Sequence, residues 1–276
     1  MRYFLLTLLL VVWYTQTVAV TDVVSHATLP TSLVSYWQLE EESSTRVDTP
    51  GVNDLTSVNV VGYAAGKQGN AADMEDGSNQ SLKIVDADQS GLDLTGSFSI
   101  NLWIKPESFS GDTPLVGKWQ HATNNQYMVY YDATTLYLIT DNSCSGFTYA
   151  NVGKSHGMST GNWYMVTVTY TSGTNTVEFW VNGSSLGTAT GQTPSNCGAD
   201  FYLGDRHGNG VPQFDGLMDE VGIWSKVLSS TEIADLYNSG NGIPYQAAAG
   251  SNIATTPVTI NGGTLRVSGG MFITTQ

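Results

Sequence analysis

Apolar and polar residues alternate along much of the chain. A period of two is typical of β-strands that bury one face, because successive strand side chains point to opposite sides. The pattern predicts strands over six segments: 97–104, 127–131, 136–139, 163–170, 176–181 and 185–190. Asn182-Gly183 favours a tight hairpin turn between the last two segments. Closely spaced strands with Gly- and Asn-rich turns indicate a sandwich or a barrel.

One segment near the end of this region has helical features. Residues 229–232, Ser-Ser-Thr-Glu, form a capping-box pattern, in which a hydroxyl and a glutamate three residues later satisfy free backbone N–H groups. Ile233, Leu236 and Tyr237 then recur on one face, and Gly240 is a good helix stop. We therefore predict one short helix.

The N-terminus has the order of features of a secretory signal. Arg2 precedes an apolar run over 4–12, and small residues end at Ala19. The run is short for a membrane span, so we expect cleavage, with an uncleaved anchor as the alternative. No later apolar stretch is long enough to predict a transmembrane span in the mature chain. The predicted organisation is a signal peptide over 1–20, a main domain over 21–245 and a linker with a tail over 246–276.

The tail combines short apolar runs with Gly turns. The runs cover 258–260, 265–267 and 271–273, and Arg266 is the only charged residue among them. Strands this short cannot bury a face alone, and an uncharged strand edge favours pairing. We expect a short β-rich tail that forms a homo-oligomer or docks on a larger surface assembly. A flexible remnant of a longer protein is the alternative.

Charge narrows the possible partners. The 276 residues include 10 Lys and Arg against 24 Asp and Glu, which gives a formal net charge of −14. Nucleic acids and anionic membranes attract basic proteins, so neither is an expected partner. Few charges with many glycines and aromatics suit an extracellular β protein. In an exported chain, the two cysteines, Cys144 and Cys197, favour a disulfide, with two free thiols as the alternative.

Five blocks stand in a fixed order along the chain. They are LVSYWQLE at 33–40, GKQGNA at 66–71 together with 97–106, GNW at 161–163, VNG at 181–183, and FDGLMDEVGIW at 214–224 followed by the helix. Together they resemble the laminin-G-like jelly-roll domain of the concanavalin A-like lectin/glucanase superfamily, which includes pentraxins. The resemblance covers about 33–245. It implies an all-β fold of two antiparallel sheets in a jelly-roll sandwich, with the first and last strands adjacent.

The resemblance also implies a structural calcium ion where the last strand meets the first. Calcium takes roughly six to eight oxygen ligands. By position, Asp219 would supply a carboxylate, and Glu40 and the Asp76-Gly77 turn would supply further oxygens. The alternative is that Asp219 hydrogen-bonds a neighbouring turn. Gly222 stands where the family usually carries Arg, so we do not expect the salt bridge that is common in relatives.

Catalysis is not expected. Glycoside hydrolysis needs two carboxyl groups about 5–9.5 Å apart, and glucanases of this superfamily place them in a Glu-x-Asp-x-x-Glu motif that this chain lacks. The glutamates at 40–42 have another spacing, and Asp219 and Glu220 would point to opposite faces of a strand. The four histidines lack the His-x-x-x-His spacing of zinc sites and are expected in exposed loops.

Aromatic residues are the candidates for ligand contact. Tryptophans in the alternating segments are expected in the core: Trp37, Trp103, Trp163 and Trp224. Sugars stack on exposed rings and hydrogen-bond to Asp, Asn and Arg. A ligand rim is therefore predicted from six residues in loops or at strand ends: Trp119, His121, Tyr149, Asp205, Arg206 and His207.

These patterns together indicate a secreted or cell-surface, non-enzymatic recognition module, with carbohydrate as the favoured ligand class. One alternative is a structural or adhesive surface protein whose jelly roll contacts other proteins. Another is a degenerate glycoside hydrolase. The expected partner is therefore a glycan or a cell-surface protein.

Overall fold

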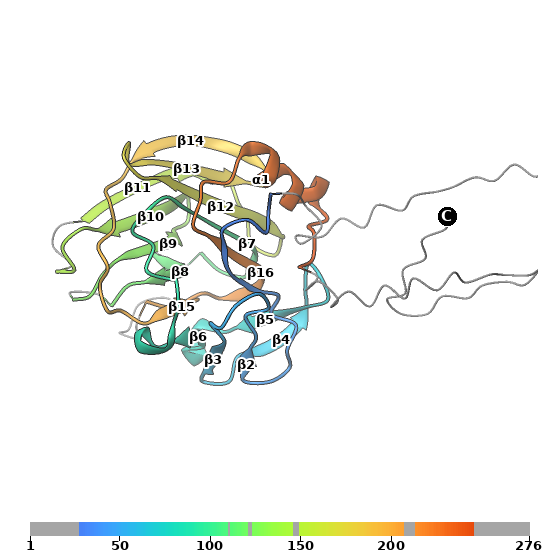
Figure 1. Cartoon of the computed structure of the whole chain (residues 1–276). Helices are drawn as coiled ribbons and strands as arrows, with labels where there is room; N and C mark the ends of the chain where they lie inside the picture. The colour runs from blue at the N-terminus through green and yellow to red at the C-terminus, as the bar shows by residue number, and fades with distance from the viewer. Residues whose placement is uncertain (1–27, 110, 121–122, 146–148, 207–212, 246–276) are drawn as a thin grey trace, which may run out of the picture.

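The alternating segments fold as the strands of a sandwich. The computed structural model describes residues 28–245 except 110, 121–122, 146–148 and 207–212. In this part the fold is the expected all-β one, with two antiparallel eight-stranded sheets and one short α-helix (Figure 1). The predicted signal peptide (1–20) and the tail (246–276) lie outside the described residues, so they stay predictions.

Two sheets, here named A and B, contain the strands of the described residues. Sheet A has the order β14-β13-β12-β7-β16-β5-β4, and β1 also pairs with β16. Its strands are β1 (Leu33–Trp37), β4 (Gly62–Ala65), β5 (Asn70–Met74), β7 (Phe98–Pro106), β12 (Tyr164–Thr171), β13 (Thr176–Val181), β14 (Ser184–Thr190) and β16 (Gly216–Trp224). Sheet B has the order β11-β10-β9-β8-β15-β6-β3-β2. Its strands are β2 (Thr45–Arg46), β3 (Leu55–Val58), β6 (Ser81–Ile84), β8 (Thr113–Lys118), β9 (Tyr127–Tyr131), β10 (Thr135–Asp141), β11 (Tyr149–Ser155) and β15 (Phe201–Leu203).

The six segments predicted from alternation are confirmed as β7, β9, β10, β12, β13 and β14, with ends that differ by no more than two residues. The first and last strands are also adjacent, as the resemblance implied, because Tyr36 of β1 pairs with Gly222 of β16. Among the described helices, none is long and apolar enough to cross a membrane.

The main core lies between the two sheets. Inward side chains of every long strand meet there, and Trp37 stacks on Phe201 across the interface with ring centroids 5.3 Å apart. Burying apolar area at roughly 25 cal/mol per Å² makes this layer the main source of stability. The prediction that Trp37 lies in the core is therefore confirmed.

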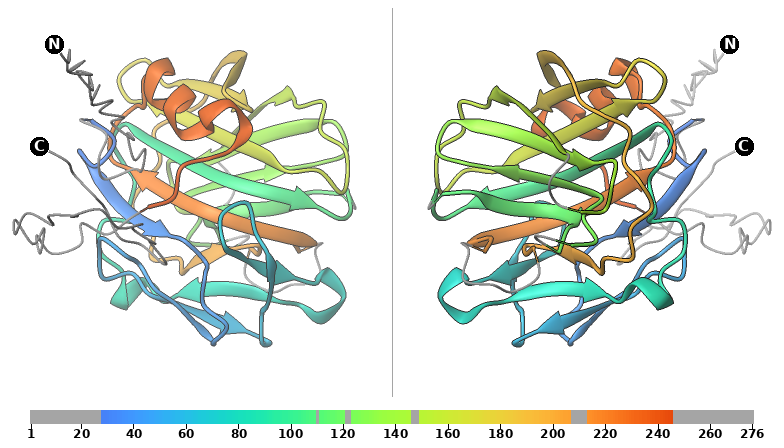
Figure 2. Two further views of the ribbon diagram at one scale, coloured as in Figure 1. Left: turned by 90° about the vertical axis from the view of Figure 1, so that its right-hand side faces the viewer. Right: turned by 90° about the vertical axis from the view of Figure 1, so that its left-hand side faces the viewer.

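A second apolar layer lies on the outer face of sheet A, beneath α1 (Ser230–Tyr237) (Figure 2, left). The predicted capping box is present: the Ser229 side chain accepts from the Glu232 N–H, and Glu232 Oε2 accepts from the Ser229 N–H at 2.8 Å. Trp103 and Trp224 are buried here, under the helix and not between the sheets. Trp163 is only partly buried against the same layer.

A buried arginine contacts one edge of sheet A, next to strand β4. Arg46 is fully buried, and its guanidinium donates to the carbonyls of Ser43, Val61 and Gly62. Glu42 hydrogen-bonds to the hydroxyl of Tyr63, which belongs to β4. The segment around β2 therefore satisfies carbonyl groups that an edge strand would otherwise expose.

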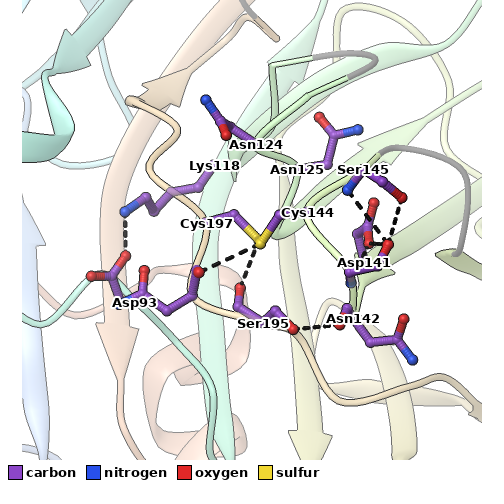
Figure 3. Close-up of a disulfide and its surroundings, with 12 residues drawn as sticks. Asp93, Lys118, Asn124, Asn125, Asp141, Asn142, Cys144, Ser145, Ser195 and Cys197 are labelled. Atoms are coloured by element: carbon purple, nitrogen blue, oxygen red, sulfur yellow. Dashed lines mark hydrogen bonds and ion pairs between the residues drawn. A yellow bond between two sulfur atoms is a disulfide. The ribbon is translucent and has the colours of Figure 1, made fainter.

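The predicted disulfide between Cys144 and Cys197 is confirmed, with the two Cα atoms 5.4 Å apart (Figure 3). It joins the loop after β10 to the segment that leads into β15. Ser195 supports the same junction, because its N–H donates to the Asp141 carbonyl at 2.9 Å and its hydroxyl donates to the Asn142 carbonyl at 2.6 Å. The two loops therefore meet at one rim of the sandwich.

Removing this bridge should destabilise the protein. The bridge spans 53 residues, and loop-closure entropy for that length gives roughly 4 kcal/mol of stabilisation. We expect the Cys144→Ser/Cys197→Ser double variant to lose about this much in the free energy of unfolding, measured by denaturant titration. The wild-type protein under reducing conditions is the matched control. Equal stability of the double variant and the oxidised wild type would contradict the prediction.

Candidate functional site

The outer face of sheet B carries an apolar and aromatic cluster. In β9, Tyr127, Val129 and Tyr131 face the core, so the alternate residues Met128 and Tyr130 face outward. The same alternation operates in β10. We call the resulting group the aromatic cluster: Trp119, Met128, Tyr130, Tyr137 and Ile139. No described helix lies on this face, in contrast to the outer face of sheet A.

The rings of the aromatic cluster form one pair among themselves and one pair with Tyr149. Tyr130 and Tyr137 stack with centroids 4.7 Å apart and planes at 11°. Trp119 meets Tyr149 edge to face at 6.2 Å. Asn151 donates to the Tyr130 hydroxyl at 2.5 Å, so an amide from β11 fixes that ring. Tyr149 is 52% exposed while Trp119 is 5% exposed, so Trp119 forms a floor and Tyr149 presents the accessible ring.

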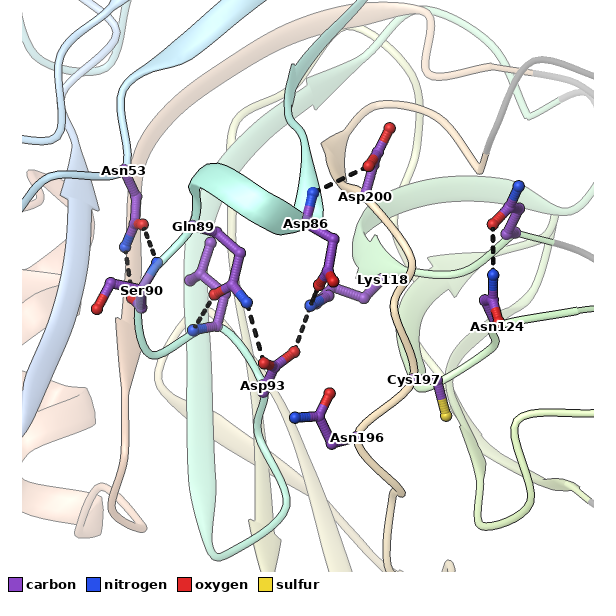
Figure 4. Close-up of polar contacts among 12 residues, drawn as sticks. Asn53, Asp86, Gln89, Ser90, Asp93, Lys118, Asn124, Asn196, Cys197 and Asp200 are labelled. Atoms are coloured by element: carbon purple, nitrogen blue, oxygen red, sulfur yellow. Dashed lines mark hydrogen bonds and ion pairs between the residues drawn. The ribbon is translucent and has the colours of Figure 1, made fainter.

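A buried lysine fixes the strand from which Trp119 extends. Lys118, the last residue of β8, is fully buried and forms ion pairs with Asp86 at 2.5 Å and with Asp93 (Figure 4). Because consecutive strand residues point to opposite sides, an inward Lys118 favours an outward Trp119. A buried charge that loses its partners is costly, so the two carboxylates hold Lys118, and with it the end of β8, in place.

The polar surroundings of the aromatic cluster are mainly acidic. Burial raises the pKa of Tyr130 to about 12, with Asp112 adding to the rise and Arg206 opposing it. The Tyr137 hydroxyl donates to Asp132 at 3.0 Å. Rings with carboxylate, amide and guanidinium groups close by offer both stacking and hydrogen bonding to a polyhydroxylated ligand.

The structure brings together part of the predicted ligand rim. Trp119 and Tyr149 are in contact, and Arg206 acts electrostatically on Tyr130 of the same cluster. Asp205 accepts the Arg206 N–H at 2.6 Å. His121 and His207 lie outside the described residues.

Sequence reasoning missed three members of this surface: Tyr130, Tyr137 and Asn151. Alternation within β9 and β10 could have indicated that the two tyrosines face outward, since each follows a residue that faces the core. The expectation that histidines lie in exposed loops is wrong for His156, which is buried. Its Nδ1 accepts from the Met158 N–H at 2.8 Å, and its Nε2 lies 3.0 Å from the Asp132 carbonyl oxygen.

A second polar site surrounds a β-bulge in β16. The register with β7 shifts between Asp219 and Gly222, and Glu220 takes a left-handed backbone angle, φ 49°. Asp219 Oδ2 accepts from the N–H groups of Lys67 and Gln68, at 2.7 and 2.9 Å. Glu220 contacts residues of the layer beneath α1. The prediction that these acids point to opposite faces is therefore wrong, because the extra residue of the bulge turns both toward the outer side of sheet A.

Gly222 is required by the packing next to this bulge. A Cβ atom on Gly222 would lie 2.4 Å from the Trp224 ring and 2.9 Å from the Tyr36 ring. The indole and the phenol therefore occupy the space into which a side chain at 222 would extend. Glu220 interacts with the Tyr36 hydroxyl and accepts the Tyr245 N–H at 3.3 Å.

The two acids of the bulge are buried and hold their protons strongly. Burial raises the pKa of Asp219 to about 8, and the Glu40 charge adds to this rise. Burial and the charge of Asp219 also raise the pKa of Glu220 well above its usual range. Asp219 Oδ1 and Glu220 Oε1 are buried without a hydrogen-bond partner.

The predicted calcium ligands do not all come together. Glu40 lies with Asp219 at the turn between β4 and β5, where its Oε2 accepts the Asn70 N–H at 2.7 Å. Asp76 and Gly77 belong to the 3-10 helix η1 (Asp76–Ser78), which follows the opposite end of β5. Within the described residues, no group of three or more His, Cys, Asp or Glu side chains is arranged as a metal site. The calcium ion therefore stays a prediction.

Comparison with known proteins agrees with this architecture. Residues 76–234 match the family model described as the concanavalin A-like lectin/glucanases superfamily, so the chain belongs to that family. A search of curated proteins finds no match.

Several solved structures share the fold at low sequence identity. Domain 4 of AbnA, a GH43 extracellular arabinanase from Geobacillus stearothermophilus in complex with arabinotriose, is 20% identical with a TM-score of 0.58, over 74% of this chain and 97% of that one. The binding domain of Paraclostridial Mosquitocidal Protein 1 is 16% identical with a TM-score of 0.59, over 76% and 52%. The binding domain of Botulinum neurotoxin DC in complex with SialylT is 15% identical with a TM-score of 0.58, over 76% and 52%. This chain thus spans about half of each toxin domain.

The raised pKa of Asp219 predicts stability that falls as pH rises. Between pH 3.8, the ordinary pKa, and about pH 8, the native state retains a proton that the unfolded chain releases. The free energy of unfolding should therefore decrease over this window, on the order of 1.4 kcal/mol for each unit of pKa difference. Denaturant titrations across this range in the presence of a chelator measure the effect. Asp219→Asn should flatten the slope, whereas the exposed control Asp112→Asn should leave it intact; identical slopes in all three proteins would refute the assignment.

Proposed function

We propose that the protein is a secreted or cell-surface carbohydrate-recognition module without catalytic activity, and that it binds glycans through the aromatic cluster and Tyr149. The observation that carries this proposal is the aromatic surface on the outer face of sheet B. It combines an accessible ring, a buried aromatic floor and hydrogen-bonding groups in one place. Such a combination suits sugars, whose C–H faces are apolar and whose hydroxyls need partners.

The structural neighbours support a binding role. The arabinanase domain was solved in complex with arabinotriose, and a Botulinum neurotoxin binding domain in complex with SialylT. These ligands were bound by those proteins. At such low sequence identity, the similarity to this chain shows a shared fold only. The lack of the glucanase motif and the burial of the Asp219–Glu220 pair, away from the aromatic cluster, favour binding over hydrolysis.

A protein partner is the second candidate. Another Botulinum neurotoxin binding domain of this fold was solved with rat synaptotagmin II. An adhesive protein would use the same outer face of sheet B, with the exposed Tyr149, for a protein contact. A glycan array separates the two, since selective sugar binding supports recognition of carbohydrate and a blank array favours adhesion.

Substitution of Tyr149 tests the site directly. If Tyr149 stacks on a sugar, Tyr149→Ala should weaken binding to the glycans selected on the array by about tenfold, which corresponds to about 1.4 kcal/mol. Tyr63→Ala is a matched control, because Tyr63 is 48% exposed on β4 in the other sheet. Titration calorimetry gives both affinities. Equal losses, or none, would place the binding site elsewhere.

We also propose that calcium binds beside the β16 bulge, with Asp219 and Glu40 as ligands and Glu220 next to them. The buried, unpartnered Asp219 Oδ1 supports this proposal, because a buried carboxylate oxygen needs a cation or a donor. The ion would replace the proton that this site otherwise retains.

Chelation tests the calcium proposal. An ion bound only by the native state raises the melting temperature by mass action, so EDTA should lower it and added calcium should restore it. Asp219→Asn should remove most of this response, while Asp112→Asn should keep it. Calorimetric scans that do not change with chelator would exclude the ion.

A further inference from the structure

A groove of about 400 Å³ lies beside β3 and β6, on the other side of β15 from the aromatic cluster. Thr56 and Lys83, which pair across these two strands, belong to its lining. Val52 and Val85 also line it and are 71% and 37% exposed. Apolar side chains left in water favour burial, so the groove suits an occupant that brings apolar side chains of its own.

The groove is acidic as well as apolar. Asp54 and Asp88 line it, and among the described residues neither belongs to an ion pair. Lys83 contributes a positive charge, but its Nζ lies 3.7 Å from Asp200, which offsets that charge. An occupant with a positive charge is therefore attracted to the groove, and an acidic one is repelled.

The last described residue, Tyr245, lies close to this groove. Its ring stacks on Tyr36 with centroids 5.0 Å apart. The Tyr36 N–H donates to Asp48 Oδ1 at 2.9 Å, and the Asp48 N–H donates to Asp54 Oδ1 at 2.8 Å. A short series of direct contacts thus connects Tyr245 to a carboxylate that lines the groove.

The tail, residues 246–276, has the chemistry that such a groove attracts. It includes no Asp or Glu, and Arg266 is its only charged residue. Leu265 and Val267 flank Arg266, so one short stretch combines a cation with two apolar side chains. The 19 residues over 246–264 could span up to roughly 65 Å when extended, so the length of chain after Tyr245 is sufficient to bring this stretch to the groove.

Covalent attachment favours the groove of the same chain over that of another copy. A tethered segment has an effective concentration of roughly millimolar at a nearby site, which is far above that of a second copy in a micromolar solution. The short apolar runs of the tail alone favour pairing with another copy or with a larger surface assembly. The position of Tyr245 close to the groove favours an intramolecular contact instead.

We infer that the groove is the docking site of the chain's own tail, through residues 264–268. Arg266 pairs with the carboxylates of Asp54 and Asp88. Leu265 and Val267 cover the two exposed valines of the groove. This contact goes beyond the proposed carbohydrate binding and does not depend on it, because the groove and the aromatic cluster lie on different strands.

Limited proteolysis tests the contact, because Arg266 offers the only trypsin site in the tail. In the protein comprising residues 21–276, cleavage after Arg266 should be slow, since trypsin cleaves only the undocked fraction. Asp54→Asn/Asp88→Asn should make this cleavage at least about tenfold faster, because it removes the charge partners of Arg266. Mass spectrometry at low trypsin concentration gives the rates.

Two further variants control the comparison. Glu107→Gln/Asp112→Asn removes the same charge from exposed positions outside the groove and should leave the cleavage rate unchanged. Val52→Thr keeps the shape of the side chain but makes it polar, so it should accelerate cleavage through loss of the apolar contact. Melting temperatures confirm that each variant folds.

The dependence on protein concentration identifies the occupant. Equal protection at roughly 1 and 100 µM, with a monomer in light scattering, supports docking on the same chain. Protection that increases with concentration would place the tail on a second copy and overturn the inference. Fast cleavage of the wild type, or equal rates in the wild type and the groove variant, would show that the groove does not hold the tail. Glycan binding is tested separately by the array, so the recognition function stands or fails independently.

Discussion

Each sheet must bury one face against the other, and this constraint determines what the two outer faces become. Strand alternation leaves every second side chain on the outside, so the composition of those positions decides whether a face is covered or open. On sheet A the outer positions include Trp103 and Trp224, and α1 covers them. On sheet B they include Tyr130 and Tyr202, which are buried without a described α-helix over them, and Tyr149, which is 52% exposed. The same geometry thus produces a second core layer on one side and, on the other, the aromatic cluster through which we propose that glycans bind.

The strands and the helix could be predicted because their signals are local. Alternation over 176–181 and a capping box at 229–232 depend only on residues close in sequence. The disulfide was also predictable, since a chain with two cysteines offers one intramolecular pairing and the signal-like N-terminus favours its oxidation. The aromatic cluster was only partly predictable. Tyr130 and Tyr137 share a face by alternation, but their stacking depends on the register between β9 and β10.

The β16 bulge shows where local reasoning fails. Alternation assigns Asp219 and Glu220 to opposite faces, and a single extra residue relative to β7 reverses that assignment. No pattern in the segment signals the bulge. Glu220 takes a left-handed backbone conformation, for which glycine would be the usual signal, and a glutamate stands there instead. Burial raises the pKa values of both carboxyl groups. The sequence alone does not reveal this cost of burying two acids side by side.

The buried guanidinium of Arg46 has a consequence for behaviour at high local concentration. A two-sheet sandwich ends in edge strands, and an exposed edge is a template on which another chain adds a strand and fibrils begin to grow. Arg46 occupies the carbonyls of Val61 and Gly62 at the β4 edge, and its charge is costly to displace from a buried position. If the protein binds a multivalent glycan surface, as we propose, its copies would be crowded against one another. Arg46 removes these two carbonyls of the β4 edge from the groups to which a strand of another copy could pair.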